Sequence, residues 1–178
     1  MQLWKSTISI LLCCLLAACA RAPEAFVVRS AAIDAGTLTA RLQWNPDARV
    51  LEALENGIPL QFDVGVAAQA DAVFGWHQTL FSQTRHLQLR YFPLSRQYQL
   101  RDLDLNTTRS YASRALAVAA LEDLRLALPD WRATAAARYR LEIALDRNAL
   151  PGALRLPALL LPAWRLCGGE FSWPARTG

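Results

Sequence analysis

Apolar and polar residues alternate with a period of two along several stretches of this chain. The alternation is clearest from Thr37 to Trp44 and from Arg138 to Asp146, where every second side chain is apolar. Because successive side chains of a β-strand point to opposite faces, this pattern predicts strands with one face in a core. The same pattern predicts further strands at Phe26–Ile33 and Ile58–Val66, and a hairpin at Leu80–Arg101.

Turn residues separate these predicted strands. Asp34-Ala35-Gly36 is typical of a tight turn between the first two strands. Residues 92–95 are expected to turn the hairpin, and Leu103 and Leu105 are expected to extend its second strand.

The first predicted helix follows directly on the second strand. Asn45 and Pro46 are typical of the cap and the first position of a helix. This helix should bury Val50, Leu51 and Leu54 and end at Asn56-Gly57.

A second helix is predicted from a serine cap at Ser113 to Leu128, because apolar residues recur there at helical spacing and Pro129 follows. Beyond Leu150, prolines recur too often for a long helix. We therefore expect that part of the chain to wrap around the domain as extended segments.

The fold class follows from the one-sided alternation, which favours antiparallel strands with one face toward a core. We expect an α+β fold, mainly an antiparallel sheet or sandwich with about two helices. No internal repeat or change in composition divides the chain, so residues 26–178 are predicted to form a single domain.

The N-terminal residues have the pattern of a targeting segment. Lys5 precedes an apolar stretch, Thr7 to Leu16, which is too short to cross a bilayer. The sequence Leu16-Ala17-Ala18-Cys19 resembles the lipobox of bacterial lipoproteins, in which the thiol of the cysteine carries the lipid. We therefore expect a signal peptide at 1–18, lipidation of Cys19 and a tether at 19–25. An ordinary secretory signal, cleaved beside one of the small residues, is the alternative.

Lipidation would attach the protein to a membrane through its acyl chains. The resemblance to lipoprotein sorting signals implies the outer membrane, because Ala20 and not aspartate follows the cysteine, and we expect the domain to face the periplasm. Of the 4 cysteines, Cys13 and Cys14 lie in the segment that we expect to be removed, and Cys19 would be acylated. Only Cys167 remains, so no internal disulfide can form. We interpret Cys167 as a small buried residue, with a reactive thiol as the alternative.

Composition excludes several classes of protein. Hydrophobic residues make up 53% of the chain and charged residues 19%, which excludes a disordered chain. The formal net charge is +4, with no dense basic patch, so no nucleic acid partner is expected.

The sequence holds none of the familiar catalytic motifs, and we expect no catalytic residues, no metal and no cofactor. Of the two histidines, His77 and His86, we interpret His77 as a structural residue rather than a metal ligand, even with Asp71 nearby. Asp102 and Asp104 share one face of the hairpin, as general acid-base pairs can, but we interpret them as solvated.

The hairpin presents a candidate binding face. From Ala72 to Arg101 the chain contains no Asp or Glu. By parity, one outward face carries basic and amide side chains: His86, Gln88, Arg90, Gln97, Gln99 and Arg101. Such a face suits an anionic partner, either an envelope protein or an anionic lipid. The alternative is a solvated face whose arginines pair with acids elsewhere. Arg96 falls on the inner parity, so it should lie at a strand end or pair with a buried acid.

Several segments in order resemble the DUF4390 family: Leu54 to Leu60, Trp76, Leu89 to Tyr91, Leu94 to Tyr98, Leu145 to Arg147, Leu150-Pro151 and Trp164 to Leu166. The resemblance extends from Phe26 to Trp173. It implies a secreted proteobacterial protein of unknown function, with no known catalytic residues, often encoded beside a membrane-bound sensor histidine kinase. Cys167 to Glu170 depart from the Ser-Ser-Gly-Trp run of the family.

We therefore expect a non-enzymatic envelope lipoprotein that acts as an accessory or binding module, with a link to envelope signalling that rests on the resemblance. One alternative is a carrier or chaperone with an apolar pocket lined by Phe62, Leu89 and Tyr98. Another is an unrecognised hydrolase, which would need polar groups clustered in one cleft.

Overall fold

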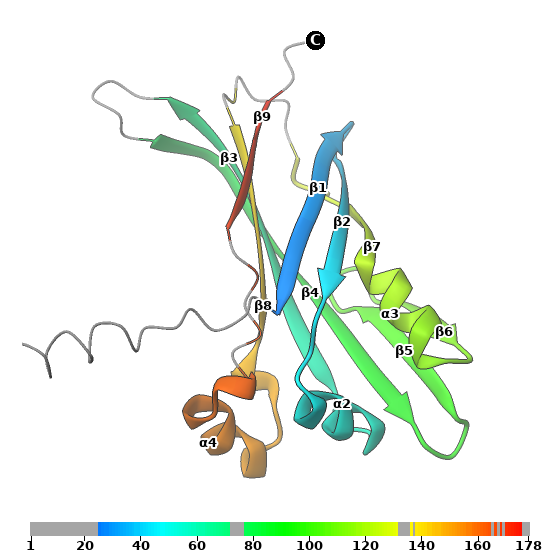
Figure 1. Ribbon diagram of the computed structural model, residues 1–178. Coiled ribbons are helices and arrows are strands. Elements are labelled where there is room, and N and C mark those ends of the chain that lie inside the picture. The colour runs from blue at the N-terminus through cyan, green and yellow to red at the C-terminus, as the bar shows by residue number, and fades with distance from the viewer. Residues whose placement is uncertain are drawn as a thin grey trace, which may run out of the picture.

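Two antiparallel β-sheets pack against each other in the computed structural model of the chain (Figure 1). The structure describes residues 25–71, 77–131, 136, 138–164, 166, 168 and 170–175. The predicted signal peptide, most of the predicted tether with Cys19, and Cys167 lie outside these residues.

The smaller sheet has the strand order β1-β2-β7 and the larger has β6-β5-β4-β3-β8-β9. The strands are β1 (Phe26–Asp34), β2 (Thr37–Trp44), β3 (Leu60–Asp71), β4 (His77–Phe92), β5 (Gln97–Asp102), β6 (Thr107–Tyr111), β7 (Asp123–Ala127), β8 (Arg138–Leu145) and β9 (Phe171–Pro174). The helices are α2 (Ala48–Glu55), α3 (Arg114–Glu122) and α4 (Gly152–Leu160), with short 3₁₀ turns η2 (Arg147–Ala149) and η3 (Pro162–Trp164). The predicted α+β class is confirmed, with three α-helices instead of about two among the described residues.

The core fills the space between the inner faces of the two sheets. Three aromatic rings meet at its centre. Phe26 stacks on Trp44 at 6.0 Å between ring centroids, and Phe62 meets both rings edge-on, at 5.4 and 5.8 Å. Edge-to-face pairs bring the positive ring edge to the negative ring face, so they add to the free energy gained by burial. The cluster joins β1 and β2 of one sheet to β3 of the other.

The predicted strands at the start of the domain are confirmed. β1 and β2 pair through the turn at Ala35 and Gly36, both at positive φ.

The cap predicted for the first helix is wrong by two residues. Asp47, not Asn45, caps α2 by accepting the backbone N–H of Arg49. Asn45 instead donates its N–H to the carbonyl of Ala25, because the pairing of β2 with the start of β1 continues past Trp44.

The predicted helix from Ser113 to Leu128 is only half correct. Ser113 does cap α3, but the helix ends at Glu122 and the chain continues as β7. Leu124 and Leu128 fit both a helical and a strand period, so the local pattern is ambiguous, whereas Leu126 fits only the strand period. Pairing decides between them, since Leu124 and Leu126 lie opposite Ala40 and Leu38 on the open edge of β2.

The hairpin is confirmed, and Arg96 lies in its turn at φ 54°, which is the predicted strand-end position. The predicted extension through Leu103 and Leu105 is wrong. The chain turns at residues 103–106 and returns as β6 along β5. β6 is a polar edge strand with little alternation in its sequence, so the hydrophobic pattern gave no signal for it.

The expectation of extended segments after Leu150 is wrong for α4, which forms a helix despite Pro157 within it. The proline removes one backbone donor, but Ala158 on the same helix is fully buried against the domain. Further on, the expectation holds for β9, which pairs with β8 at the edge of the large sheet.

Candidate binding face and buried ion network

The pairing of β4 with β5 brings the predicted binding residues together on the outer face of the large sheet. Gln88 lies opposite Arg101, Arg90 opposite Gln99, and Phe92 opposite Gln97. Directly opposite residues of an antiparallel pair point to the same side of the sheet. We call the set Gln88, Arg90, Gln97, Gln99 and Arg101 the β4–β5 face.

The two arginines of the β4–β5 face are exposed and are held by neutral groups. Arg90 donates through Nε to the carbonyl of Gly57 at 3.3 Å, and its guanidinium lies 4.7 Å from the ring centroid of Phe92. Arg101 donates to the side-chain oxygen of Asn106. Within the described residues neither guanidinium is in an ion pair. Each fork therefore keeps N–H donors for a carboxylate or phosphate.

His86 follows the same outward parity but lies among acids. Its Nδ1 is 3.0 Å from Oδ1 of Asp104, and its Nε2 is 3.9 Å from Oδ1 of Asp63 on β3. Its backbone N–H donates to Oδ2 of Asp104 at 2.6 Å. His86 therefore belongs to an acidic cluster beside the β4–β5 face, and its positive form is satisfied by the protein's own carboxylates.

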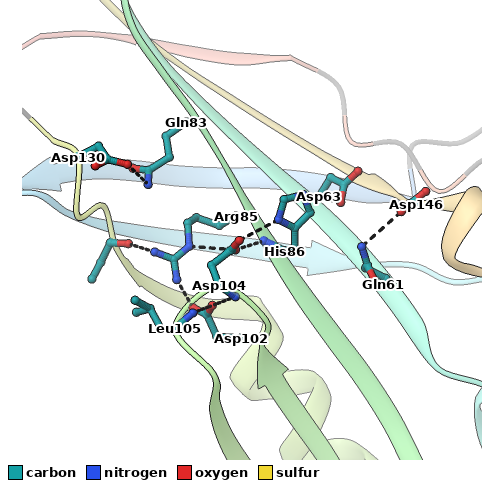
Figure 2. A network of polar contacts seen from close by, with 11 residues as sticks. Gln61, Asp63, Gln83, Arg85, His86, Asp102, Asp104, Leu105, Asp130 and Asp146 are labelled. Atoms are coloured by element: carbon teal, nitrogen blue, oxygen red, sulfur yellow. Dashed lines mark hydrogen bonds and ion pairs between the residues drawn. The ribbon is translucent and has the colours of Figure 1, made fainter.

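The side chain of Arg85 points from the other side of β4 into the space between the sheets (Figure 2). It is 1% exposed. Its guanidinium donates to Oδ2 of Asp102 at 2.6 Å and to the carbonyl of Ala127 on β7 at 2.7 Å. Its Nε is 3.3 Å from Oδ2 of Asp104, near enough for an ion pair but not aligned for a hydrogen bond.

The interpretation of Asp102 and Asp104 as solvated is wrong for Asp102. Its side chain is 11% exposed because it pairs with Arg85. Its Oδ1 also accepts the backbone N–H groups of Asp104 and Leu105 and so holds the β5–β6 turn. Asp104 then lies between Arg85 and His86 (Figure 2). The four side chains form one network that links β4, β5, the β5–β6 turn and β7.

Sequence reasoning missed the role of Arg85, although a signal existed. Arg85 has the same parity as Leu87 and Leu89, so the alternation alone places a charge on the core side of β4. A charge in that position needs a partner of opposite charge. The partner lies on the next strand of the hairpin, at a position that depends on the turn.

The network shifts the ionisation of its members. The hydrogen bond that the imidazole donates to Asp104 raises the pKa of His86 above its ordinary value, although burial acts in the opposite direction. Burial alone would raise the pKa of Asp104, but the hydrogen bonds from the backbone and ring of His86 lower it overall. Burial, followed by the charge of Asp146, raises the pKa of Asp63. The His86–Asp104 pair thus favours its charged form on both sides.

Three hollows in the surface of the described residues differ in position and lining. One, of about 300 Å³, lies on the outer face over Gly65, Ala67 and Ser82 beside Arg140. An apolar groove of about 490 Å³ lies between α2 and α3. A third, of about 250 Å³, opens between the sheets near Asp102 and Arg109.

The three residues predicted to line a carrier pocket lie in two different environments. Phe62 and Leu89 are fully buried in the packed core, while Tyr98 is half-buried and lines the groove between α2 and α3. An apolar hollow is therefore present at one of the three predicted positions.

Two features are absent from the part of the chain that the structure describes. In this part of the chain no three His, Cys, Asp or Glu side chains gather as a metal site would require. Nor does any helix in the same part have the length and apolar character that a membrane crossing takes. The side chains of His77 and Asp71 lie outside what the structure describes.

Comparison with known proteins gives one result. A family model described as a domain of unknown function, DUF4390, matches residues 25–174. No curated protein and no solved structure matches the chain.

The buried pair generates a stability prediction. Asp102→Ala leaves the guanidinium of Arg85 without its counter-charge, so we expect the free energy of unfolding to fall by about 3–5 kcal/mol. Replacing both partners, as Arg85→Met with Asp102→Leu, should recover part of that loss. Arg101→Ala, next in sequence but exposed, should change it by less than about 0.5 kcal/mol. Urea denaturation measures all three, and equal losses for Asp102→Ala and Arg101→Ala would contradict the assignment.

The histidine generates a prediction about pH. The stability that charged His86 contributes is present in full below pH 6.5 and is lost as pH rises through its raised pKa. NMR titration of the wild type should place the imidazole pKa of His86 above 6.5, and Asp104→Asn should lower it because the negative charge is lost and a neutral amide oxygen is a weaker acceptor than a carboxylate. An unchanged titration curve in Asp104→Asn would show that the two side chains do not interact in solution.

Proposed function

The chain belongs to the DUF4390 family, whose function is unknown, and on that premise we propose that it is a bacterial envelope lipoprotein acting as a non-enzymatic binding module. Acyl chains on Cys19 hold it at the outer membrane. Its domain projects into the periplasm, and the β4–β5 face binds an anionic group of a partner protein.

The anchor is supported by the N-terminal sequence. A positive residue, an apolar stretch and Leu16-Ala17-Ala18-Cys19 follow one another in the order that lipoprotein processing requires. Each buried methylene contributes about 0.8 kcal/mol to membrane attachment, so two or more acyl chains hold a protein stably. The domain then needs no membrane-crossing segment of its own.

The binding role is carried by one observation, which is the state of Arg90 and Arg101. Both are exposed on one face and neither pairs with a carboxylate among the described residues. The Gly57 carbonyl and the Phe92 ring already restrict the side chain of Arg90, so Arg90 loses less side-chain entropy when it binds an anionic group. The neighbouring amides can both donate and accept, which suits a carboxylate-rich protein surface.

The ionisable cluster beside this face supports a structural role rather than acid-base catalysis. The guanidinium of Arg85 is 1% exposed, and Asp102 is occupied by Arg85 and by the turn. Asp104 is occupied by Arg85 and His86. Groups that satisfy one another in this way leave little capacity to exchange protons with a substrate.

A carrier of a lipid or an apolar segment is the second candidate, and the groove between α2 and α3 favours it. Trp44, Leu51, Tyr98 and Val118 line this groove. Native mass spectrometry of the protein purified from its membrane would detect a bound lipid, and such a ligand would favour this candidate over the first.

The anchor is tested at its cysteine. We expect Cys19→Ser to abolish incorporation of labelled palmitate and to move the protein from the membrane fraction to the soluble one. The control, Cys167→Ser, removes the other cysteine outside the predicted signal peptide and should leave both unchanged. Palmitate incorporation into the Cys19→Ser protein would refute the anchor.

The binding face is tested by charge reversal. We expect Arg90→Glu with Arg101→Glu to eliminate the partner band in crosslinking of cells, read by mass spectrometry, because the new carboxylates repel an anionic partner. The melting temperature should hardly change, since both side chains are exposed. Arg29→Glu with Arg41→Glu makes the same charge change on the small sheet and should retain the band. A partner band that persists in both double variants would show that the β4–β5 face is not the binding site. If the Arg90→Glu and Arg101→Glu variant loses only a crosslink to a lipid and no crosslink to a protein, the partner is an anionic lipid.

A further inference from the structure

Helix α4 exposes an apolar face. Leu156, Leu159 and Leu160 are 65%, 54% and 69% exposed. Residues three and four apart lie on one side of a helix, so the three side chains form a single patch. Ala158, on the opposite side, is fully buried, and Leu154 is half-buried.

The outward side of α4 lacks the charges that a water-facing helix normally carries. Gly152 and Ala153 are also exposed there, and Arg155 is the only exposed residue of the helix that is charged. The one charged residue of the helix, Arg155, donates to the carbonyl of Leu150 at the start of the helix. Clustered exposed leucines of this kind mark a contact with an apolar medium or with a partner.

The location of α4 indicates which medium that is. β1 starts on the side of the molecule that faces α2 and α4 and runs away from them, while β2 and β8 run toward these helices (Figure 1). The chain therefore enters the domain at this end, where the Ala25 carbonyl accepts the N–H of Asn45. The β4–β5 turn reaches the same end and carries Leu94, which is fully exposed.

Chain length then limits how far this end can be from the membrane. Six peptide units join Cys19 to Ala25. A fully extended chain spans at most about 3.6 Å per residue, so the domain begins within about 22 Å of the backbone of Cys19. The lipid anchor, which belongs to the proposed function, would thus hold the α4 end close to the bilayer surface.

We propose that the leucine face of α4 lies in the interfacial region of the membrane and orients the domain on the bilayer. The contact is made by α4 and not by the whole end, because α2 beside it carries exposed Glu52 and Glu55. A few leucines bind a membrane weakly on their own, but the anchor makes the contact intramolecular and so raises the effective concentration. Arg155 can extend its guanidinium toward lipid phosphates.

The test places a fluorophore on the helix of the acylated protein. Leu159→Cys in a Cys167→Ser background is labelled with an environment-sensitive dye, and the protein is reconstituted in vesicles of phosphatidylethanolamine and phosphatidylglycerol. We expect blue-shifted emission and several-fold stronger quenching by spin-labelled lipid than for the dye at Leu116→Cys. Leu116 is a matched control because it is a helical leucine of α3 with 56% exposure.

A second variant shows whether the leucine face itself causes the contact. Adding Leu156→Glu should reduce the quenching at position 159 to the level of the control, while the anchored protein still floats with the vesicles. Equal quenching at 159 and 116 in floating protein would overturn this inference and leave the anchor intact. A blue shift without lipid quenching, which a second copy or another protein would cause, would also overturn it. Failure to float would refute the anchor and, with it, the orientation that depends on it.

Discussion

The packing of the small sheet against the large one determines where every other feature of the domain can lie. The strands that line the core each have one apolar face, and these faces meet around the rings of Phe26, Trp44 and Phe62. Because the inner faces are buried by this contact, polar residues of β4 and β5 are directed to the outside of the large sheet. The β4–β5 face is thus a consequence of the same packing that forms the core.

The buried Arg85 adds a polar link to this apolar contact. Its bonds to Asp102 and to the Ala127 carbonyl connect β5 of the large sheet with β7 of the small sheet. A buried ion pair is weak evidence for net stability, because removing both charges from water costs about as much as their attraction returns. The ion pair instead selects the register in which β5 pairs with β4. Asp102 can reach Arg85 only when β5 is paired in one way with β4, and that pairing also places Arg101 beside Gln88.

Two proposed surfaces then face in different directions for physical reasons. The leucine face of α4 lies where the chain enters the domain, at the end nearest the proposed anchor. The β4–β5 face lies along the outer side of the large sheet, away from the core and open to a partner. A domain oriented by α4 would present this side at a fixed angle to the membrane, which would reduce the orientational cost of binding another envelope component.

The sequence by itself determined the elements whose signal is local. The period of two predicted β1, β2, β3 and β8 and the parity of Arg90 and Arg101, because a strand with one buried face repeats its pattern along its own length. The tertiary structure alone decided the rest. Leu124 fits either a helix or a strand until it pairs with Ala40 on the open edge of β2, and β6 has no hydrophobic pattern because it lies at the edge of its sheet. The partners of Arg85 and His86 come from other elements, through turns and pairings that no local pattern contains.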